Sequence, residues 1–193
     1  MEKDADILVM ATGTHVKAHD GVRAAINTLP DKVLVIAAAG NRDHCERVIF
    51  PARMPRVMCT YATTPTNYVL RALNPNPRTN AYNFGILGIA IQPEGWDTPL
   101  TGTSYAAAIA ATLAARLLDF SRQTVPDGER KLNLEGHEKM NVIFEDLARD
   151  NTNQGYSCIV PWRMLHILEE GQTEEEHRRR IREYFADLIL QHM

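Results

Sequence analysis

The sequence has few of the features that mark secreted, disulfide-bonded or membrane-spanning proteins. It contains only three cysteines among 193 residues, and none of them forms a CxxC spacing. An odd, scattered set favours free thiols in a reducing compartment over a disulfide framework. The longest apolar run, VLVIAAAG at 33–40, is far shorter than the roughly 20 residues of a membrane span. The N-terminus also lacks the long apolar stretch of a signal peptide. We therefore expect a cytoplasmic protein that does not bind a membrane.

An excess of positive charge is missing too. Lys and Arg number 21 against 24 Asp and Glu, which gives a formal net charge of −3, whereas nucleic-acid-binding proteins usually carry a strongly basic face. The glycines form neither GxGxxG nor GxxxxGK[ST], so a Rossmann-like nucleotide binder has little support. No acidic cluster or carbonyl-rich loop is typical of a calcium site. We expect no nucleic-acid partner, no cofactor and no metal.

The sequence does contain an alternation of short apolar runs with helical patterns. Hydrophobic residues make up 45% and charged residues 23%, which is enough for a packed core. Strand-sized runs that are apolar throughout and alternate with helices are typical of a parallel sheet covered on both faces. We expect strands at 5–13, 32–41, 56–63 and 84–91, and a helix at 20–29. A long Ala- and Leu-rich helix is expected from about residue 104 to 122. Because it is apolar on nearly every side, it should be buried.

The composition changes after Arg122. We expect a polar linker at 123–137, an amphipathic helix at 138–150, an extended segment followed by a helix at 155–170, and a final helix at 173–192. The final helix opens with Thr173 and Glu176, which is the spacing of a capping box. Glu174 and Arg178 have the i,i+4 spacing of an ion pair on a solvated face.

The stretch TGTSYAAA at 101–108 places Ser104 at the start of the Ala-rich helix. Ser and Thr are common helix N-caps, so Thr103 or Ser104 could have that structural role alone. Three features favour a nucleophile. Gly102 allows a ligand to approach closely, the following alanines leave room, and a helix N-terminus offers free N–H groups to an oxyanion. The pattern is not GxSxG, so it does not support an α/β-hydrolase elbow.

Asn41 ends the second apolar strand and follows Gly40. Open α/β sheets bind ligands at the carboxyl ends of their strands. A carboxamide N–H₂ can donate to an oxygen that becomes negative. Taken alone, however, an Asn after Gly is more typical of a turn.

Together these motifs resemble a known family. AAAGN at a strand end, then FPARMPRV, then GTS opening an Ala-rich helix resemble the subtilisin-like serine peptidases (subtilases, peptidase S8). The resemblance covers about residues 5–122 and departs at Ala108, where the family usually has Pro. It implies that Ser104 is the nucleophile and that Asn41 is an oxyanion-hole donor. It also implies substrate-binding positions at Ala11, Thr12, Gly13, Ala38, Ala39, Gly40, Gly102 and Thr103.

The resemblance implies a fold and a division of the chain. The fold would be α/β, a parallel-sheet subtilisin-like three-layer fold that is incomplete at its N-terminal side and carries a C-terminal helical tail. Residues 1–122 would form the C-terminal half of a subtilase catalytic domain, and residues 123–193 a helical C-terminal extension. GYSCIVPW at 155–162 resembles the tail that follows intracellular subtilase domains of filamentous fungi.

Two catalytic residues stay unassigned. A serine hydroxyl needs a base to take its proton, and the subtilase order is Asp, His, Ser. The family's D-T/S-G and H-G-T motifs are absent from this sequence, and its histidines lie in unsuitable positions: His15, His19, His44, His137, His166, His177 and His192. We predict a serine endopeptidase domain for a peptide or protein substrate that is inactive alone and needs an upstream polypeptide segment with the Asp and His. The alternative is a non-catalytic interaction or regulatory module in fungal signalling.

Overall fold

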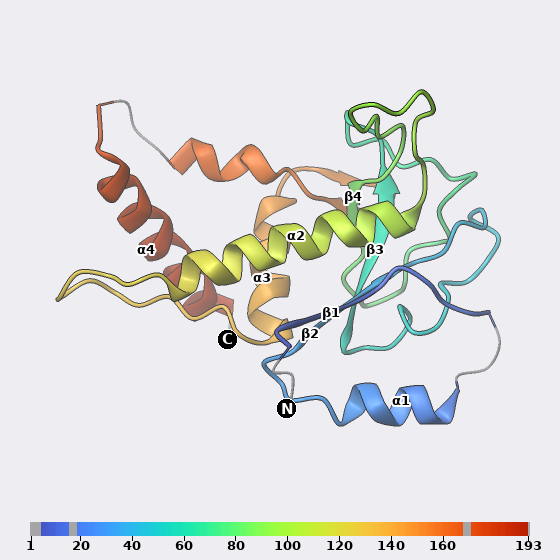
Figure 1. Cartoon of the computed structure of the whole chain (residues 1–193), viewed down its shortest axis with the longest axis horizontal. Helices are drawn as coiled ribbons and strands as arrows, with labels where there is room; N and C mark the ends of the chain where they lie inside the picture. The colour runs from blue at the N-terminus through green and yellow to red at the C-terminus, as the bar shows by residue number, and fades with distance from the viewer. Residues whose placement is uncertain (1–4, 16–18, 168–170, 193) are drawn as a thin grey trace.

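One mixed sheet forms the centre of the chain (Figure 1). The computed structural model describes residues 5–15, 19–167 and 171–192. The strands of this described part are β1 (Ile7–Met10), β2 (Leu34–Ala38), β3 (Val57–Thr63), β4 (Phe84–Leu87), β5 (Thr152–Asn153) and β6 (Tyr156–Cys158). The helices are α1 (Asp20–Asn27), α2 (Thr103–Arg122), α3 (His137–Leu147) and α4 (Glu174–His192), with a 3₁₀ helix, η1, at Pro161–Ile167. Each of the expected strands and helices has a counterpart within a few residues of its predicted bounds.

The last two strands come from the segment after Arg122. Strand β6 pairs in parallel with β4, with Phe84 opposite Ser157, and β5 runs antiparallel to β6. The chain reverses at Gln154 and Gly155, whose φ angles are positive at 55° and 87°. Tyr156 is buried against the sheet. The surrounding NTNQG stretch is polar and lacks the apolar alternation by which a strand is recognised.

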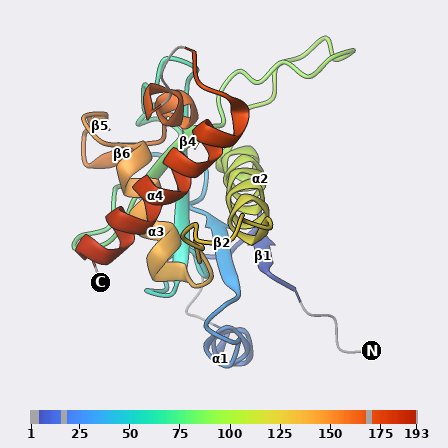
Figure 2. The same cartoon turned by 90° about the vertical axis from the view of Figure 1, so that its left-hand side faces the viewer.

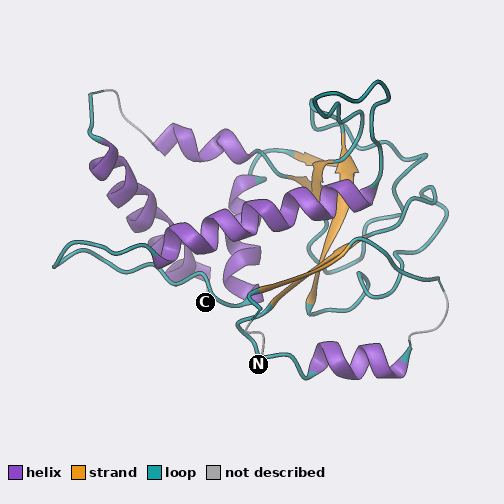
Figure 3. Cartoon of the chain, in the orientation of Figure 1, coloured by secondary structure: helices purple, strands orange, loops and turns teal. Residues whose placement is uncertain are grey.

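The two faces of the sheet are covered in different ways. Helices α2, α3 and α4 share one core with inward residues of the sheet such as Leu34 and Ile36. On the other face Tyr61 packs with the loop 48–54 and with Ile26, which is the buried residue of α1. In Figure 3, α3 and α4 lie to the left of the strands, whereas many of the long loops lie to the right and α1 lies below.

The predicted fold class was therefore wrong. It specified a parallel sheet between helical layers and a helical tail, whereas the sheet is mixed, in the order β1-β2-β3-β4-β6-β5. Two strands belong to the supposed tail, and loops with one short helix cover the second face. A parallel sheet needs crossover helices on its faces, but the connection from β2 to β3 is an irregular loop that itself fills the core at Phe50 and Ala52.

Helix α2 packs through a stripe of small residues. Ala106, Ala110 and Ala114 recur every four residues and are each 0% exposed, so the helix can approach the sheet closely as it crosses over it (Figure 1). Thr112 and Arg116, on the other side, are exposed. The expectation that this helix is buried on nearly every side was wrong, because alanines tolerate solvent as readily as a core.

Helix α4 starts at the predicted capping box. The Thr173 N–H donates to Glu176 Oε2 at 2.7 Å, and the Glu176 N–H donates to Thr173 Oγ1 at 3.3 Å. The Thr173 N–H bond, together with the bond that the Thr173 hydroxyl donates to the same carboxylate at 2.8 Å, holds the pKa of Glu176 below its ordinary value. The Arg178–Glu174 pair also forms, at 2.5 Å. Both predictions are confirmed. Within the described residues, no helix combines the length and the apolar character that a membrane crossing requires.

A projecting loop leads into α2. Ile91 and Leu100 form an antiparallel bridge through two backbone hydrogen bonds of 2.9 and 2.7 Å. The residues between them extend away from the body of the molecule (Figure 2). The bridge fixes the chain just before Gly102, and so it orients the entry into the helix that carries Ser104.

Candidate active site

Three segments that are distant in the sequence meet at the N-terminus of α2. Ser104 Oγ donates a hydrogen bond to the carbonyl oxygen of Ala11 at 2.7 Å. The Thr103 N–H donates to Asn41 Oδ1 at 2.8 Å. Asn41 follows β2 and Ala11 follows β1, and these two strands are parallel neighbours. Their carboxyl ends therefore lie at the same edge of the sheet, which brings Ser104, Asn41 and the segment 11–13 together.

Thr103 fixes the orientation of the Asn41 side chain. Its hydroxyl donates to Asn41 Oδ1 at 3.0 Å and accepts the Gly40 N–H at 3.2 Å. Because Asn41 Oδ1 receives two donors from Thr103, the other end of the amide, Nδ2, must carry the N–H groups. No described residue accepts a hydrogen bond from this Nδ2. Thr103 is fully buried and holds the site together, so the predicted substrate-binding position has a structural role here.

The backbone N–H of Ser104 is the second available donor. The N–H groups of Tyr105 and Ala106 both point to the carbonyl oxygen of Gly102, at 3.1 and 3.5 Å, and the Thr103 N–H is taken by Asn41. Nothing in the described part of the chain accepts the Ser104 N–H. The N-terminus of a 20-residue helix adds a partial positive charge at this point.

Gly102 is the N-cap of α2 and makes no side-chain cap bond. Neither Thr103 nor Ser104 is therefore the cap residue of this helix. The φ angle of Gly102 is +156°, and a Cβ built there would lie 3.2 Å from Asn41 Nδ2. The glycine lets the amide group lie directly against the helix start, beside the Ser104 N–H.

The Ser104 hydroxyl has no base beside it. Its hydrogen bond goes to a backbone carbonyl, which orients the proton but cannot remove it. None of the described histidine or carboxylate side chains is bonded to Ser104. His15 lies 3.7 Å from Glu46, and His44 lies 3.9 Å from Cys45. The side chain of His166 lies outside the described part of the chain.

The predicted substrate-binding residues differ in exposure. Ala11, Thr12 and Gly13 are exposed, beyond the end of β1. A Cβ on Gly13 would lie 2.4 Å from the Phe50 carbonyl oxygen, so only glycine allows this segment to lie so close to the 48–54 loop.

Ala38, Ala39 and Gly40 are instead buried. The side chain of Ile49 lies over Gly40, with its Cγ2 at 3.0 Å from an ideal Cβ. Their contact with a substrate therefore stays a prediction, and Ile49 is the residue that a specificity pocket at this position would have to displace. Sequence reasoning missed Ile49 because nothing in its local pattern distinguishes it from other apolar loop residues.

A large cavity lies elsewhere in the described part of the chain. It has a volume of about 1120 Å³ and is lined by the loop 45–48, the start of β3, the segment 76–82 and the start of α3. Neither Ser104 nor Asn41 lines it. The candidate site therefore lies at the sheet edge, apart from this cavity.

Comparison with known proteins shows likeness in structure. No family model and no curated protein matches the chain. The solved structure of the prenylagaramide maturation protease PagA matches with a TM-score of 0.61 and 24% identity, over 93% of this chain and 62% of that one. A serine-to-alanine mutant of the protease domain of PatA matches with a TM-score of 0.60 and 21% identity, over 88% and 62%. The self-cleaved PatA protease domain matches at 0.55 and 21%, over 81% and 59%.

The chain thus spans less than two thirds of the length of these solved chains. At such identities the likeness is one of fold. The chain shares the fold of the PagA protease and of the PatA protease domain over the part that it covers.

Proposed function

We propose that this chain carries the nucleophile and the oxyanion-binding half of a subtilisin-like serine endopeptidase site. One observation carries the proposal. The Ser104 hydroxyl lies at the start of α2 beside two N–H donors, Asn41 Nδ2 and the Ser104 amide, that have no acceptor among the described residues. A carbonyl oxygen that becomes negative needs such prearranged donors.

In the proposed reaction Ser104 Oγ attacks a peptide carbonyl carbon. The hydroxyl proton passes to a histidine, and the carbonyl oxygen becomes an oxyanion held by Asn41 Nδ2 and the Ser104 N–H. Collapse breaks the C–N bond, the histidine returns the proton to the leaving amine, and water then hydrolyses the acyl-enzyme. The exposed segment 11–13 would lie beside the substrate backbone, since Ala11 is already bonded to Ser104.

The base has to come from another polypeptide segment, because no described side chain supplies it. We place that segment, with the Asp and the His, along β1. This strand is at the edge of the described sheet, and its Leu8 and Val9 are 37% and 40% exposed. Unpaired edges with apolar side chains are templates for a further strand. Alone, the chain would be inactive.

The alternative is a non-catalytic interaction or regulatory module in fungal signalling that keeps the fold. The bond from Ser104 Oγ to a carbonyl instead of a base favours it. A fungal, intracellular type and a cytoplasmic location remain part of the proposal. The fungal type rests on the resemblance of GYSCIVPW at 155–162. The intracellular location is supported by the three free cysteines, of which Cys45 is exposed, as in a reducing compartment.

A peptide boronic acid tests the two oxyanion donors by a reaction with Ser104 that needs no catalytic base. Boron accepts the Ser104 oxygen, the hydroxyl proton leaves to solvent, and a tetrahedral boronate anion forms where the oxyanion would lie. We expect an adduct at Ser104, read by ¹¹B NMR and intact mass. In Asn41→Asp its affinity should fall about 10²-fold, since an oxyanion-hole asparagine is worth about 10²–10³ in subtilisin.

Asn41→Asp is the most informative variant, because it removes only the side-chain N–H donor. The new carboxylate still accepts both hydrogen bonds from Thr103. Thr103→Ser is the matched control, since it retains the hydroxyl, and it should bind like the wild type. Adduct formation that is equal in Asn41→Asp and the wild type, or that persists in Ser104→Ala, would contradict the proposed site.

A further inference from the structure

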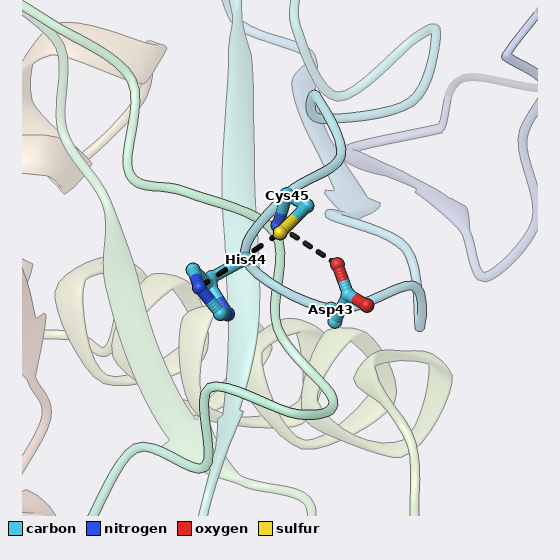
Figure 4. Close-up of side chains that lie close together, drawn as sticks. All are labelled: Asp43, His44 and Cys45. Atoms are coloured by element: carbon cyan, nitrogen blue, oxygen red, sulfur yellow. Dashed lines mark hydrogen bonds between the residues drawn. The ribbon is translucent and has the colours of Figure 1, made fainter.

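Three side chains with metal-ligating atoms converge in the loop after Asn41. They are Asp43, His44 and Cys45, which project from successive residues of this loop (Figure 4). One ligand atom from each lies within 4.8 Å of the others. The proposed peptidase site uses none of them, and the sequence analysis expected no metal. Their donors are an oxygen, a nitrogen and a sulfur.

The distance between these ligand atoms is close to the distance between ligands around a bound metal ion. Cys45 Sγ lies 3.9 Å from His44 Nε2. In a tetrahedral zinc site with bonds of about 2.0–2.3 Å, neighbouring ligand atoms are roughly 3.3–3.8 Å apart. Asp43 Oδ1 accepts the Cys45 N–H at 2.8 Å, which keeps the carboxylate on the side of the turn where Cys45 lies. The three ligand atoms, all within 4.8 Å of one another, are thus close enough to converge on one ion by side-chain rotation.

We propose that Asp43, His44 and Cys45 form a binding site for a borderline-soft divalent cation of the Zn²⁺ class. A mixed set of thiolate, imidazole and carboxylate suits Zn²⁺ and disfavours Mg²⁺ and Ca²⁺, which take oxygen ligands. The cation displaces the Cys45 thiol proton to solvent and keeps water in its remaining position. This site is independent of the proposed function, although it begins two residues after Asn41.

The site is accessible, and the other thiols do not compete for the ion. Asp43, His44 and Cys45 are all exposed, so an ion reaches them without unfolding. Cys59 and Cys158 are buried, and burial raises the pKa of each thiol to about 11, which disfavours the thiolate that binds metals. A metal–thiolate signal from the folded chain therefore reports Cys45.

Cobalt is the probe, because Co²⁺ replaces Zn²⁺ and its bond to a thiolate gives a charge-transfer absorption band. Titration of the purified chain with CoCl₂ should give this band at one equivalent, and ZnCl₂ should abolish it by displacement. Asp43→Asn and His44→Gln should each weaken Co²⁺ binding at least about tenfold, as expected for loss of one of three ligands. Cys45→Ser should remove the band.

Two exposed positions outside the cluster provide matched controls. Asp97→Asn and His19→Gln make the same chemical changes elsewhere, and both should titrate like the wild type. Zn²⁺ should also slow alkylation of Cys45 by N-ethylmaleimide, and His44→Gln should lose this protection. Absence of the band in the wild type, or a band that survives in Cys45→Ser, would overturn the proposal.

Discussion

The purified chain is expected to react with a fluorophosphonate probe no faster than its Ser104→Ala variant. The Ser104 hydroxyl donates to the Ala11 carbonyl, which cannot take a proton in the pH range of proteins. In subtilisin, loss of either the nucleophile or the histidine lowers turnover by about 10⁶-fold. A chain that has the serine and the oxyanion donors but no base should therefore keep only a very small fraction of the full enzyme's reactivity. Intact-mass spectrometry over hours gives the rate.

The comparison needs a folded Ser104→Ala control, because a hydroxyl elsewhere can react slowly with the same probe. Circular dichroism of both proteins establishes that the substitution leaves the fold intact. Rapid labelling that disappears in Ser104→Ala would contradict this prediction. It would mean that a base reaches Ser104 within the chain itself.

A chain that ends at Arg122 is expected not to fold. It would lack α3 and α4, which share one core with the sheet, and the strands β6 and β5, which extend the sheet beyond β4. Phe84 of β4 packs edge-to-face on Phe144 of α3, with ring centroids 5.3 Å apart, and both rings are fully buried. Removal of the tail would expose this core to water. The shortened chain should show no cooperative transition in urea.

A point substitution tests the same packing within the whole chain. Phe144→Ala should lower the free energy of unfolding by about 3–5 kcal/mol, the usual cost when a buried aromatic side chain is lost. Leu190→Ala is the matched control in the same tail, because Leu190 is 69% exposed, and it should change stability by less than about 0.5 kcal/mol. A cooperative, stable 1–122 chain or a near-neutral Phe144→Ala would show that the tail is an independent appendage.

Local pattern predicted much of the arrangement around Ser104. Continuous apolar runs located β1 to β4, and the Ala-rich segment located α2. The resemblance to subtilases, through the motifs AAAGN and GTS, implied that Asn41 lies near the start of α2. The hairpin of β5 and β6 could not be found in this way, although an extended segment was expected at the start of 155–170. Two or three residues carry too little periodicity, and their pairing depends on β4, about 70 residues earlier.

Details that depend on contacts across the chain were also beyond the sequence. The hydrogen bonds from Thr103 to the Asn41 side chain join residues 62 positions apart in the sequence. Ile49 covers Gly40 only because its loop folds back on β2. The convergence of Asp43, His44 and Cys45 is a matter of turn geometry. Motif spacing indicated which residues belong to the site, but not which of them face solvent.

¹H–¹⁵N correlation NMR tests the central claim most directly, because it observes the two proposed N–H donors as separate signals. The claim is that Asn41 Nδ2 and the Ser104 amide are prearranged for an oxyanion beside a serine that has no base. In ¹⁵N-labelled chain, a peptide boronic acid should shift the Asn41 side-chain amide and the Ser104 backbone amide together, in proportion to the adduct. Chemical-shift changes confined to the cavity lined by His137 would contradict the claim. So would a modified Ser104 with no shift change at either donor.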